Sequence, residues 1–275
     1  MLNAKKILDL ILIVVLSTFC SVNTSNMPTD ARHPYGVFIG AEKEKLLTLK
    51  NHDTLIVDAE CLTAENIDTM FKNGNNEIYS YLNIGSIESF RSYYEEFLPL
   101  TMGEYENWDD EKWIDISSEQ WQTHIREAAD ELLDKGVSGI FVDNTDVYYV
   151  FHEQKMYNAL IDIFNIFSKK GVEVIVNGGD VFISEAINNC SVPSCIKAVN
   201  QENVFTSIDF DEQSFGINNR EDREYFIDYL DICKQKGLDV FLIEYGAKDK
   251  LKEKIMCYCD ENDFVCYFAD SIALD

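Results

Sequence analysis

The stretch "KGVSGIFVDNTDVYY" (residues 135–149) contains a pattern that occurs three times in this chain. Each copy has Lys-Gly, a short apolar run and a polar residue at its end; the others are "KGVEVIVNGG" (170–179) and "KGLDVFLIEYG" (236–246). A glycine that follows a helical segment suits the left-handed position where a helix ends. A nearly continuous apolar run indicates a strand buried on both faces, as in a parallel sheet covered by helices.

Eight segments of the chain have this strand character. They are 35–40, 54–60, 77–86, 139–144, 173–179, 197–205, 239–246 and 264–271. Apolar residues at spacings of three and four predict helices between several of them, at 117–136, 153–169, 221–236 and 249–261. Strands that alternate with helices favour a parallel sheet, and eight such units favour a closed barrel.

We therefore predict a single (β/α)8 TIM barrel over residues 30–275, with an eight-stranded parallel core. The alternative is an open, doubly wound sheet, which usually has a glycine-rich phosphate turn after its first strand. The segment "GVFIGAEKEK" (36–45) has no G-x-G-x-x-G, so the open sheet is disfavoured.

The first 26 residues are typical of a targeting segment. Lys5 and Lys6 precede an apolar run from Ile7 to Phe19 that only Asp9 interrupts, and small polar residues follow. The run is short for a transmembrane helix, so we predict a signal peptide or an uncleaved N-terminal anchor. The rest of the protein is then expected to be secreted or at the cell surface, with no further membrane contact.

The chain is strongly acidic. Its 23 Lys and Arg residues against 49 Asp and Glu residues give a formal net charge of −26. Such a charge repels nucleic acid and anionic membranes and attracts cationic ligands. We expect a monomer without a nucleic-acid partner; an acidic surface that only keeps the protein soluble is the alternative interpretation.

The eight cysteines are consistent with disulfide bonds in an exported protein. "CSVPSC" places Cys190 and Cys195 across a short turn, and we predict a bridge there. A second bridge could form among Cys257, Cys259 and Cys266. A zinc site is disfavoured because C-x-C is not the usual zinc spacing and the nearest histidine, His152, is far away in the sequence. No metal or cofactor is expected.

Polar residues follow most of the predicted strands, where a barrel carries its catalytic groups. They are Asp58, Glu60, Glu88, Asp143, Asn144, Asp146, Asn177, Glu202, Glu244, Tyr245 and Asp270. Paired carboxylates can hydrolyse glycosides. They could instead hold a divalent metal or bind a cation without chemistry. Ser–His catalysis is disfavoured because no histidine ends a strand and no G-x-S-x-G occurs.

Aromatic residues near the same strand ends favour a sugar ligand over a metal, because flat rings pack against sugar faces. Tyr81, Tyr245 and Trp108 are examples, although core packing explains many such residues equally well.

Five motifs, in this order, resemble glycoside hydrolase family 114, the endo-α-1,4-polygalactosaminidase-like (β/α)8 barrels. They are "YLNIGSIESFRSYY" (81–94), "WDDEKWIDIS" (108–117), "GVSGIFVDNTDVYY" (136–149), "VNGG" (176–179) and "LIEYG" (242–246). A glutamate on the sixth strand adds to the resemblance. In one departure, Ser86 stands where many bacterial relatives have a glutamate.

The resemblance implies an exported hydrolase of α-1,4-linked galactosamine polymers, which are cationic when deacetylated. It implies Asp143 as the nucleophile and Glu202 as the general acid/base, with Glu212 as the rival if the register of the sixth strand differs. Arg91 is expected to brace a carboxylate. The expected substrate-binding residues are Asp58, Tyr81, Glu88, Asn144, Asp146, Asn177, Glu244 and Tyr245. The alternative is a barrel that binds carbohydrate without cleaving it.

Overall fold

The computed structural model describes residues 31–106 and 108–275. The predicted signal or anchor at residues 1–26 therefore lies outside the described residues. None of the helices in the described part combines the length and the apolar character that are needed to cross a membrane.

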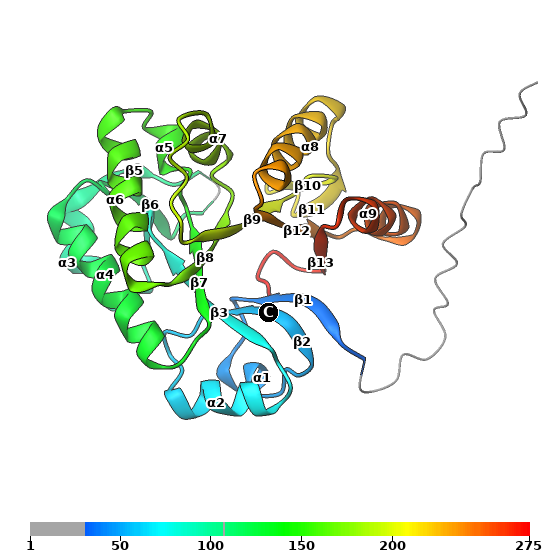
Figure 1. The fold of residues 1–275 in the computed structure, drawn as a ribbon, viewed down its shortest axis with the longest axis horizontal. Coiled ribbons are helices and arrows are strands. Elements are labelled where there is room, and N and C mark those ends of the chain that lie inside the picture. The colour runs from blue at the N-terminus through cyan, green and yellow to red at the C-terminus, as the bar shows by residue number, and fades with distance from the viewer. Residues whose placement is uncertain (1–30, 107) are drawn as a thin grey trace, which may run out of the picture.

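The eight predicted strands form one parallel sheet, and each lies beside its sequence neighbours among the eight (Figure 1). They are β1 (His33–Phe38), β2 (His52–Val57), β3 (Glu77–Asn83), β7 (Gly139–Asp143), β8 (Glu173–Asn177), β9 (Ile196–Glu202), β12 (Asp239–Tyr245) and β13 (Val265–Ala269). The predicted (β/α)8 barrel is confirmed. A sheet in this order brings the carboxyl ends of all eight strands to one rim.

The barrel is nearly closed between β1 and β13. The described residues form no strand ladder at this seam, but the Gly40 amide donates to the Leu274 carbonyl at 3.2 Å. The Tyr267 ring lies 5.7 Å from Phe38 and 6.4 Å from Tyr35, centroid to centroid. Aromatic packing therefore replaces backbone pairing at the seam.

Helices cover the outside of the sheet (Figure 1). They are α1 (Lys43–Leu46), α2 (Ala64–Lys72), α4 (Glu119–Asp134), α6 (Gln154–Lys170), α7 (Asp180–Asn188), α8 (Arg220–Gln235) and α9 (Asp249–Asn262), with the shorter α3 (Tyr94–Phe97), η1 (Leu98–Leu100) and α5 (Val147–Val150). Gly171 ends α6 with φ of 70°, which is the left-handed cap predicted from the Lys-Gly junction. A separate apolar cluster fills the barrel interior, with Val37, Ile56, Phe141 and Ile175 among its members.

Two additions to the barrel were not predicted from the sequence. Strands β4 (Ser86–Glu88), β5 (Thr101–Glu104) and β6 (Glu111–Ile114) form a small antiparallel sheet after β3. Strands β10 (Thr206–Asp209) and β11 (Ser214–Ile217) form a hairpin after β9. Both additions follow the carboxyl end of a barrel strand, so both extend the rim where a site is expected.

The predicted disulfides are absent from the described residues. Cys195 is buried, and its thiol contacts the Phe164 carbonyl at 3.2 Å, whereas Cys190 is exposed. Cys259 is buried and Cys266 is half-buried, and no covalent bridge joins them. The prediction of a Cys190–Cys195 bridge was wrong for this structure because the two side chains point into different surroundings.

Candidate active site

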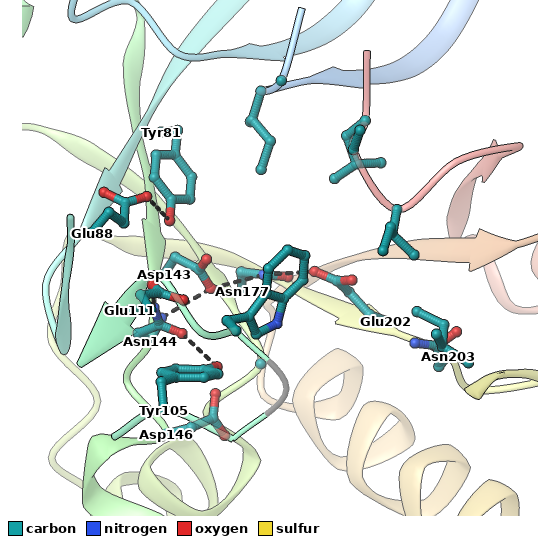
Figure 2. A pocket seen from close by; sticks show the side chains of 18 of the residues that line it. Tyr81, Glu88, Tyr105, Glu111, Asp143, Asn144, Asp146, Asn177, Glu202 and Asn203 are labelled. Carbon is teal, nitrogen blue, oxygen red and sulfur yellow. Dashed lines mark hydrogen bonds between the residues drawn. The ribbon is translucent and has the colours of Figure 1, made fainter. Parts of the chain in front are cut away.

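A cavity of about 650 Å³ opens at the carboxyl ends of the barrel strands (Figure 2). Eight carboxyl groups line it: Asp58, Glu88, Asp110, Glu111, Asp143, Asp146, Asp180 and Glu202. Arg91 is the one cationic side chain among the described residues that line it. The cavity is therefore strongly acidic.

Asp143 and Glu202 lie at the centre of this cavity and share one hydrogen-bond donor. They are the last residues of β7 and β9, and Asn177 ends β8 between them. The Asn177 Nδ2 donates to Asp143 Oδ1 at 2.9 Å and to Glu202 Oε1 at 2.8 Å (Figure 2). The sum of these two lengths is an upper limit for the separation of the two carboxyl oxygens.

A chain of buried side chains fixes the orientation of the Asn177 amide. Its Oδ1 accepts a hydrogen bond from Asn200 Nδ2 at 2.6 Å, and Asn200 Oδ1 accepts one from the Tyr35 hydroxyl at 3.1 Å. Because the Asn177 oxygen is engaged on that side, its NH₂ group must face the two carboxylates.

The pKa of Asp143 is raised above that of an ordinary aspartate, so this group becomes mostly ionised only above about pH 6. Burial and the charge of Glu202 raise the pKa of Asp143 to about 6. Hydrogen bonds from the Asn177 side chain and from the Asn144 amide, at 2.9 Å each, oppose this rise because they favour the charged carboxylate. Glu202 is held on its other oxygen by the Tyr245 hydroxyl at 2.7 Å.

Arg91 binds three of the carboxylates predicted at the rim. Its guanidinium lies 2.6 Å from Glu88 Oε2 and 2.9 Å from Asp58 Oδ2, and it also pairs with Glu60. The Tyr81 hydroxyl donates to Glu88 Oε1 at 3.2 Å. Arg91 braces carboxylates, as predicted, and Asp58, Glu60 and Glu88 share its single positive charge.

Asn144 and Glu111 form a second polar group beside Asp143 (Figure 2). Asn144 has φ of 63°, a left-handed conformation that Asn tolerates better than most residues. Its Oδ1 accepts from the Tyr105 hydroxyl at 3.0 Å, and its Nδ2 donates to Ser86 Oγ at 2.8 Å and Glu111 Oε1 at 3.0 Å. Asn144 was predicted from the sequence as a site residue, whereas Glu111 and Tyr105 were not.

Asp146 lines the cavity, but its carboxylate supports the turn after β8. Both of its oxygens accept from the Gly179 amide at 3.2 Å. A Cβ at Gly178, where φ is 63°, would lie 2.6 Å from Asp146 Oδ2. The two glycines of "VNGG" therefore allow the backbone to approach this carboxylate. Burial and the charge of Asp180 raise the pKa of Asp146 to about 7.

Glu244 is the one predicted site residue that lies outside the cavity. Successive strand residues face opposite sides of a sheet, so Tyr245 points into the barrel and Glu244 points out. Glu244 is fully buried, and its carboxylate accepts from the Thr206 amide at 2.8 Å, the Thr206 hydroxyl at 2.6 Å and the Phe205 amide at 3.0 Å. The expected contact with substrate is corrected to a structural role that anchors the start of β10.

The other nine predicted residues line the cavity: Asp58, Tyr81, Glu88, Asp143, Asn144, Asp146, Asn177, Glu202 and Tyr245. The rival Glu212 is exposed in the turn between β10 and β11 and does not line it. Among the described residues, no group of three or more His, Cys, Asp or Glu is arranged to hold a metal ion.

Aromatic side chains from the two added elements meet across the cavity. Trp108 lies between β5 and β6, and Phe210 lies between β10 and β11. Their ring centroids are 6.0 Å apart with an interplanar angle of 71°. Both rings line the cavity and form an aromatic wall of it.

Comparisons with known proteins agree with this arrangement. The family model for glycoside hydrolase family GH114 matches residues 25–271, and no curated protein sequence matches. The glycoside hydrolase domain of PelA from Pseudomonas aeruginosa superposes with a TM-score of 0.72 at 17% identity, over 89% of this chain and 96% of that chain. Ega3 from Aspergillus fumigatus, in a complex with galactosamine, gives 0.63 at 17% identity, over 90% and 93%. At these identities the structural matches show the fold alone.

Proposed function

The chain belongs to glycoside hydrolase family GH114, and on that premise we propose that it cleaves α-1,4-linked galactosamine polysaccharides with Asp143 and Glu202. The observation that carries the proposal is the pair of carboxylates held by one Asn177 amide at the carboxyl end of the barrel. Glycoside hydrolysis needs two carboxyl groups with different roles, and this pair is placed to supply them.

The short distance between the pair supports a retaining mechanism. The two hydrogen bonds of 2.9 and 2.8 Å limit how far apart the facing oxygens can lie. Retaining enzymes separate their carboxyl groups by roughly 5–5.5 Å, and inverting enzymes by roughly 6.5–9.5 Å to admit a water molecule. The limit on the two facing oxygens therefore favours the retaining arrangement over the inverting one.

In the proposed first step, the ionised Asp143 attacks the anomeric carbon while Glu202 donates a proton to the leaving oxygen. This forms a glycosyl ester on Asp143 and releases the rest of the polymer with a free hydroxyl. In the second step, Glu202 takes a proton from water as the water attacks the anomeric carbon, and Asp143 leaves as a carboxylate. The Asn177 NH₂ group favours the charged form of Asp143 at the start and at the end of the cycle.

The acidic cavity and the net charge of −26 support a cationic polymer as the substrate. The galactosamine in the Ega3 complex is consistent with the same sugar class. As part of the same proposal, the protein acts outside the cytoplasm, which rests on the sequence of residues 1–26.

The proposal is tested by measuring product release from partly deacetylated α-1,4-galactosaminogalactan. Wild-type protein is expected to cleave it, and Asp143→Asn is expected to lose activity by about 10³-fold or more. Asp260→Asn, an exposed aspartate on α9, is the matched control and should behave as wild type. If the wild type binds the polymer without cleaving it, the barrel is a carbohydrate-binding protein. If Asp143→Asn cleaves normally, the assigned nucleophile is wrong.

The retaining mechanism has a separate test. Proton NMR of the first products should show the α-anomer before mutarotation, because two displacements restore the configuration of the substrate. Initial release of the β-anomer would exclude the mechanism while leaving the hydrolase assignment intact.

A further inference from the structure

Glu111 is a third carboxyl group beside the catalytic pair, and the proposed mechanism does not use it. It is the first residue of β6, where it pairs in antiparallel register with Glu88 of β4. Figure 2 shows it next to Asn144 and Asp143. Its side chain lines the cavity, so a bound sugar would meet it.

One oxygen of Glu111 is fully occupied by protein donors. Oε1 accepts from Ser86 Oγ at 2.5 Å, from Asn83 Nδ2 at 2.7 Å and from Asn144 Nδ2 at 3.0 Å. An acceptor with three donors is fixed in position. The carboxyl group therefore has one oxygen, Oε1, that the protein anchors, and a second oxygen, Oε2, that these three donors do not contact.

The three donors are themselves oriented by further contacts. Asn83 Oδ1 accepts from the Ser86 amide at 3.0 Å, so its NH₂ group faces Glu111. Asn144 Oδ1 accepts from Tyr105, which turns its NH₂ group the same way. Ser86 Oγ accepts from both amides, at 2.7 and 2.8 Å, so its own proton is directed to Glu111. Three hydrogen-bond donors with fixed orientations therefore hold the Glu111 carboxyl group in place.

The second oxygen of Glu111, Oε2, has no hydrogen-bond partner in the part of the chain that the structure describes. It is also not one of the fully buried unpartnered atoms, so it is open to the cavity. An anchored carboxyl group that presents one free oxygen can accept a hydrogen bond from a ligand. The donor that fits must tolerate the negative charges around it.

The charges that face Glu111 are negative. Asp143 on β7 and Glu88 on β4 lie near it, and together with burial they raise the pKa of Glu111 to about 7. Arg91 is the cationic side chain among the described residues that line the cavity, but its guanidinium is already paired with Asp58, Glu60 and Glu88. A cationic group next to Oε2 would relieve this repulsion and favour the charged carboxylate.

We propose that Glu111 Oε2 recognises the ammonium group of a deacetylated amino sugar in the cavity. This inference rests on the proposed function and assigns to it a residue that selects the deacetylated substrate. An ammonium group brings a positive charge and three donors to the free oxygen. An N-acetyl group brings one neutral donor and a methyl group instead, so it gains less at this position.

Glu111→Gln is the sharpest variant for a test. The glutamine keeps an oxygen for the three anchoring donors and replaces only the free oxygen by NH₂, which repels a cation. Glu104→Gln on the neighbouring strand β5 is the matched control, because Glu104 is exposed and does not line the cavity. Thermal unfolding of each variant checks that the fold is retained.

The readout is the dissociation constant of galactosamine and of N-acetylgalactosamine, measured by calorimetric titration at pH 7. Glu111→Gln should weaken galactosamine binding by about tenfold or more and change N-acetylgalactosamine binding by less than about twofold. Glu104→Gln should match the wild type for both sugars. An equal loss for both sugars, or no loss for either, would overturn the inference.

Cleavage of the polymer separates this inference from the proposed function. If the wild type cleaves the polymer but Glu111→Gln keeps its preference for galactosamine, the hydrolase stands and the role of Glu111 is refuted. If the wild type binds galactosamine through Glu111 but cleaves nothing, the recognition site stands and the hydrolase is refuted. If neither sugar binds and nothing is cleaved, both fail.

Discussion

Asp143 combines two requirements that conflict at low pH. A nucleophilic carboxyl group must be ionised, but burial and the Glu202 charge raise the pKa of Asp143 to about 6. Activity should therefore fall as the pH drops through about 6, with kcat/KM following the ionisation of this group in the free enzyme. A pH profile of kcat/KM on a deacetylated oligomer measures it. A profile that is flat down to pH 4.5 would contradict the assignment of Asp143.

Asn177 should control the position of that acid limb. Its NH₂ group favours the charged form of Asp143, so Asn177→Ala should raise the pKa of Asp143 and move the acid limb to higher pH. We also expect kcat to fall by about 10²-fold, because the two carboxyl groups lose their common anchor. Asn189→Ala, at the end of α7 and away from the cavity, is the control. A lower kcat with an unmoved limb would indicate a structural role only.

A site residue can be predicted from the sequence where its position at the end of a barrel strand determines where its side chain lies. Asp143, Asn177 and Glu202 end neighbouring parallel strands, and such ends must converge. Glu244 was misplaced because the alternation of strand residues puts it on the outer face, one position before Tyr245. Glu111 was missed because it lies on a short strand outside the barrel, and only its long-range pairing with Glu88 brings it to the site.

The elements that carry the aromatic wall are the two additions to the barrel. Trp108 and Phe210 come from different additions and meet at 6.0 Å across the cavity. Trp108→Ala should raise KM for the polymer by roughly three- to tenfold and change kcat less, because a stacking surface binds the substrate and the transition state alike. Trp108→Phe should recover most of the affinity. A loss confined to kcat would show that Trp108 acts on the chemistry instead.

The barrel and its additions differ in how much their sequences reveal. Barrel strands such as β7 and β8 are nearly continuous apolar runs after a Lys-Gly junction, so both their existence and their type are predictable. Strand β4 has three residues and β11 is exposed throughout, so neither carries a readable period. Their existence depends on pairing with distant partners, which local sequence does not encode.

The buried carboxyl groups of the site lower the free energy of unfolding of the whole molecule when they are ionised. Burial raises the pKa of Asp143 to about 6 and those of Asp146 and Glu111 to about 7, above the ordinary range for Asp and Glu near 4. Between about pH 4 and 7 the folded protein therefore binds more protons than the unfolded chain. This is the reverse of a salt-bridged carboxylate, and it makes the free energy of unfolding decrease as the pH rises.

Thermal unfolding should show this trend. The melting temperature is expected to fall between pH 5 and pH 8, and added salt should recover part of the loss by screening the net charge of −26. Asp146→Asn removes one of the buried charges while keeping an oxygen for the Gly179 amide. It should stabilise the protein by on the order of 4 kcal/mol at pH 8, because the pKa of Asp146 is raised by about three units and each unit is worth about 1.4 kcal/mol. The effect should shrink as the pH falls and become small below about pH 4, where the carboxyl group is protonated in the unfolded chain as well. Asp260→Asn, an exposed aspartate on α9, should leave the slope of stability against pH unchanged. A melting temperature that rises toward pH 8 would mean that these carboxyl groups stay ionised in the fold without penalty, and that the acidic cavity is neutralised by a partner other than its own protons.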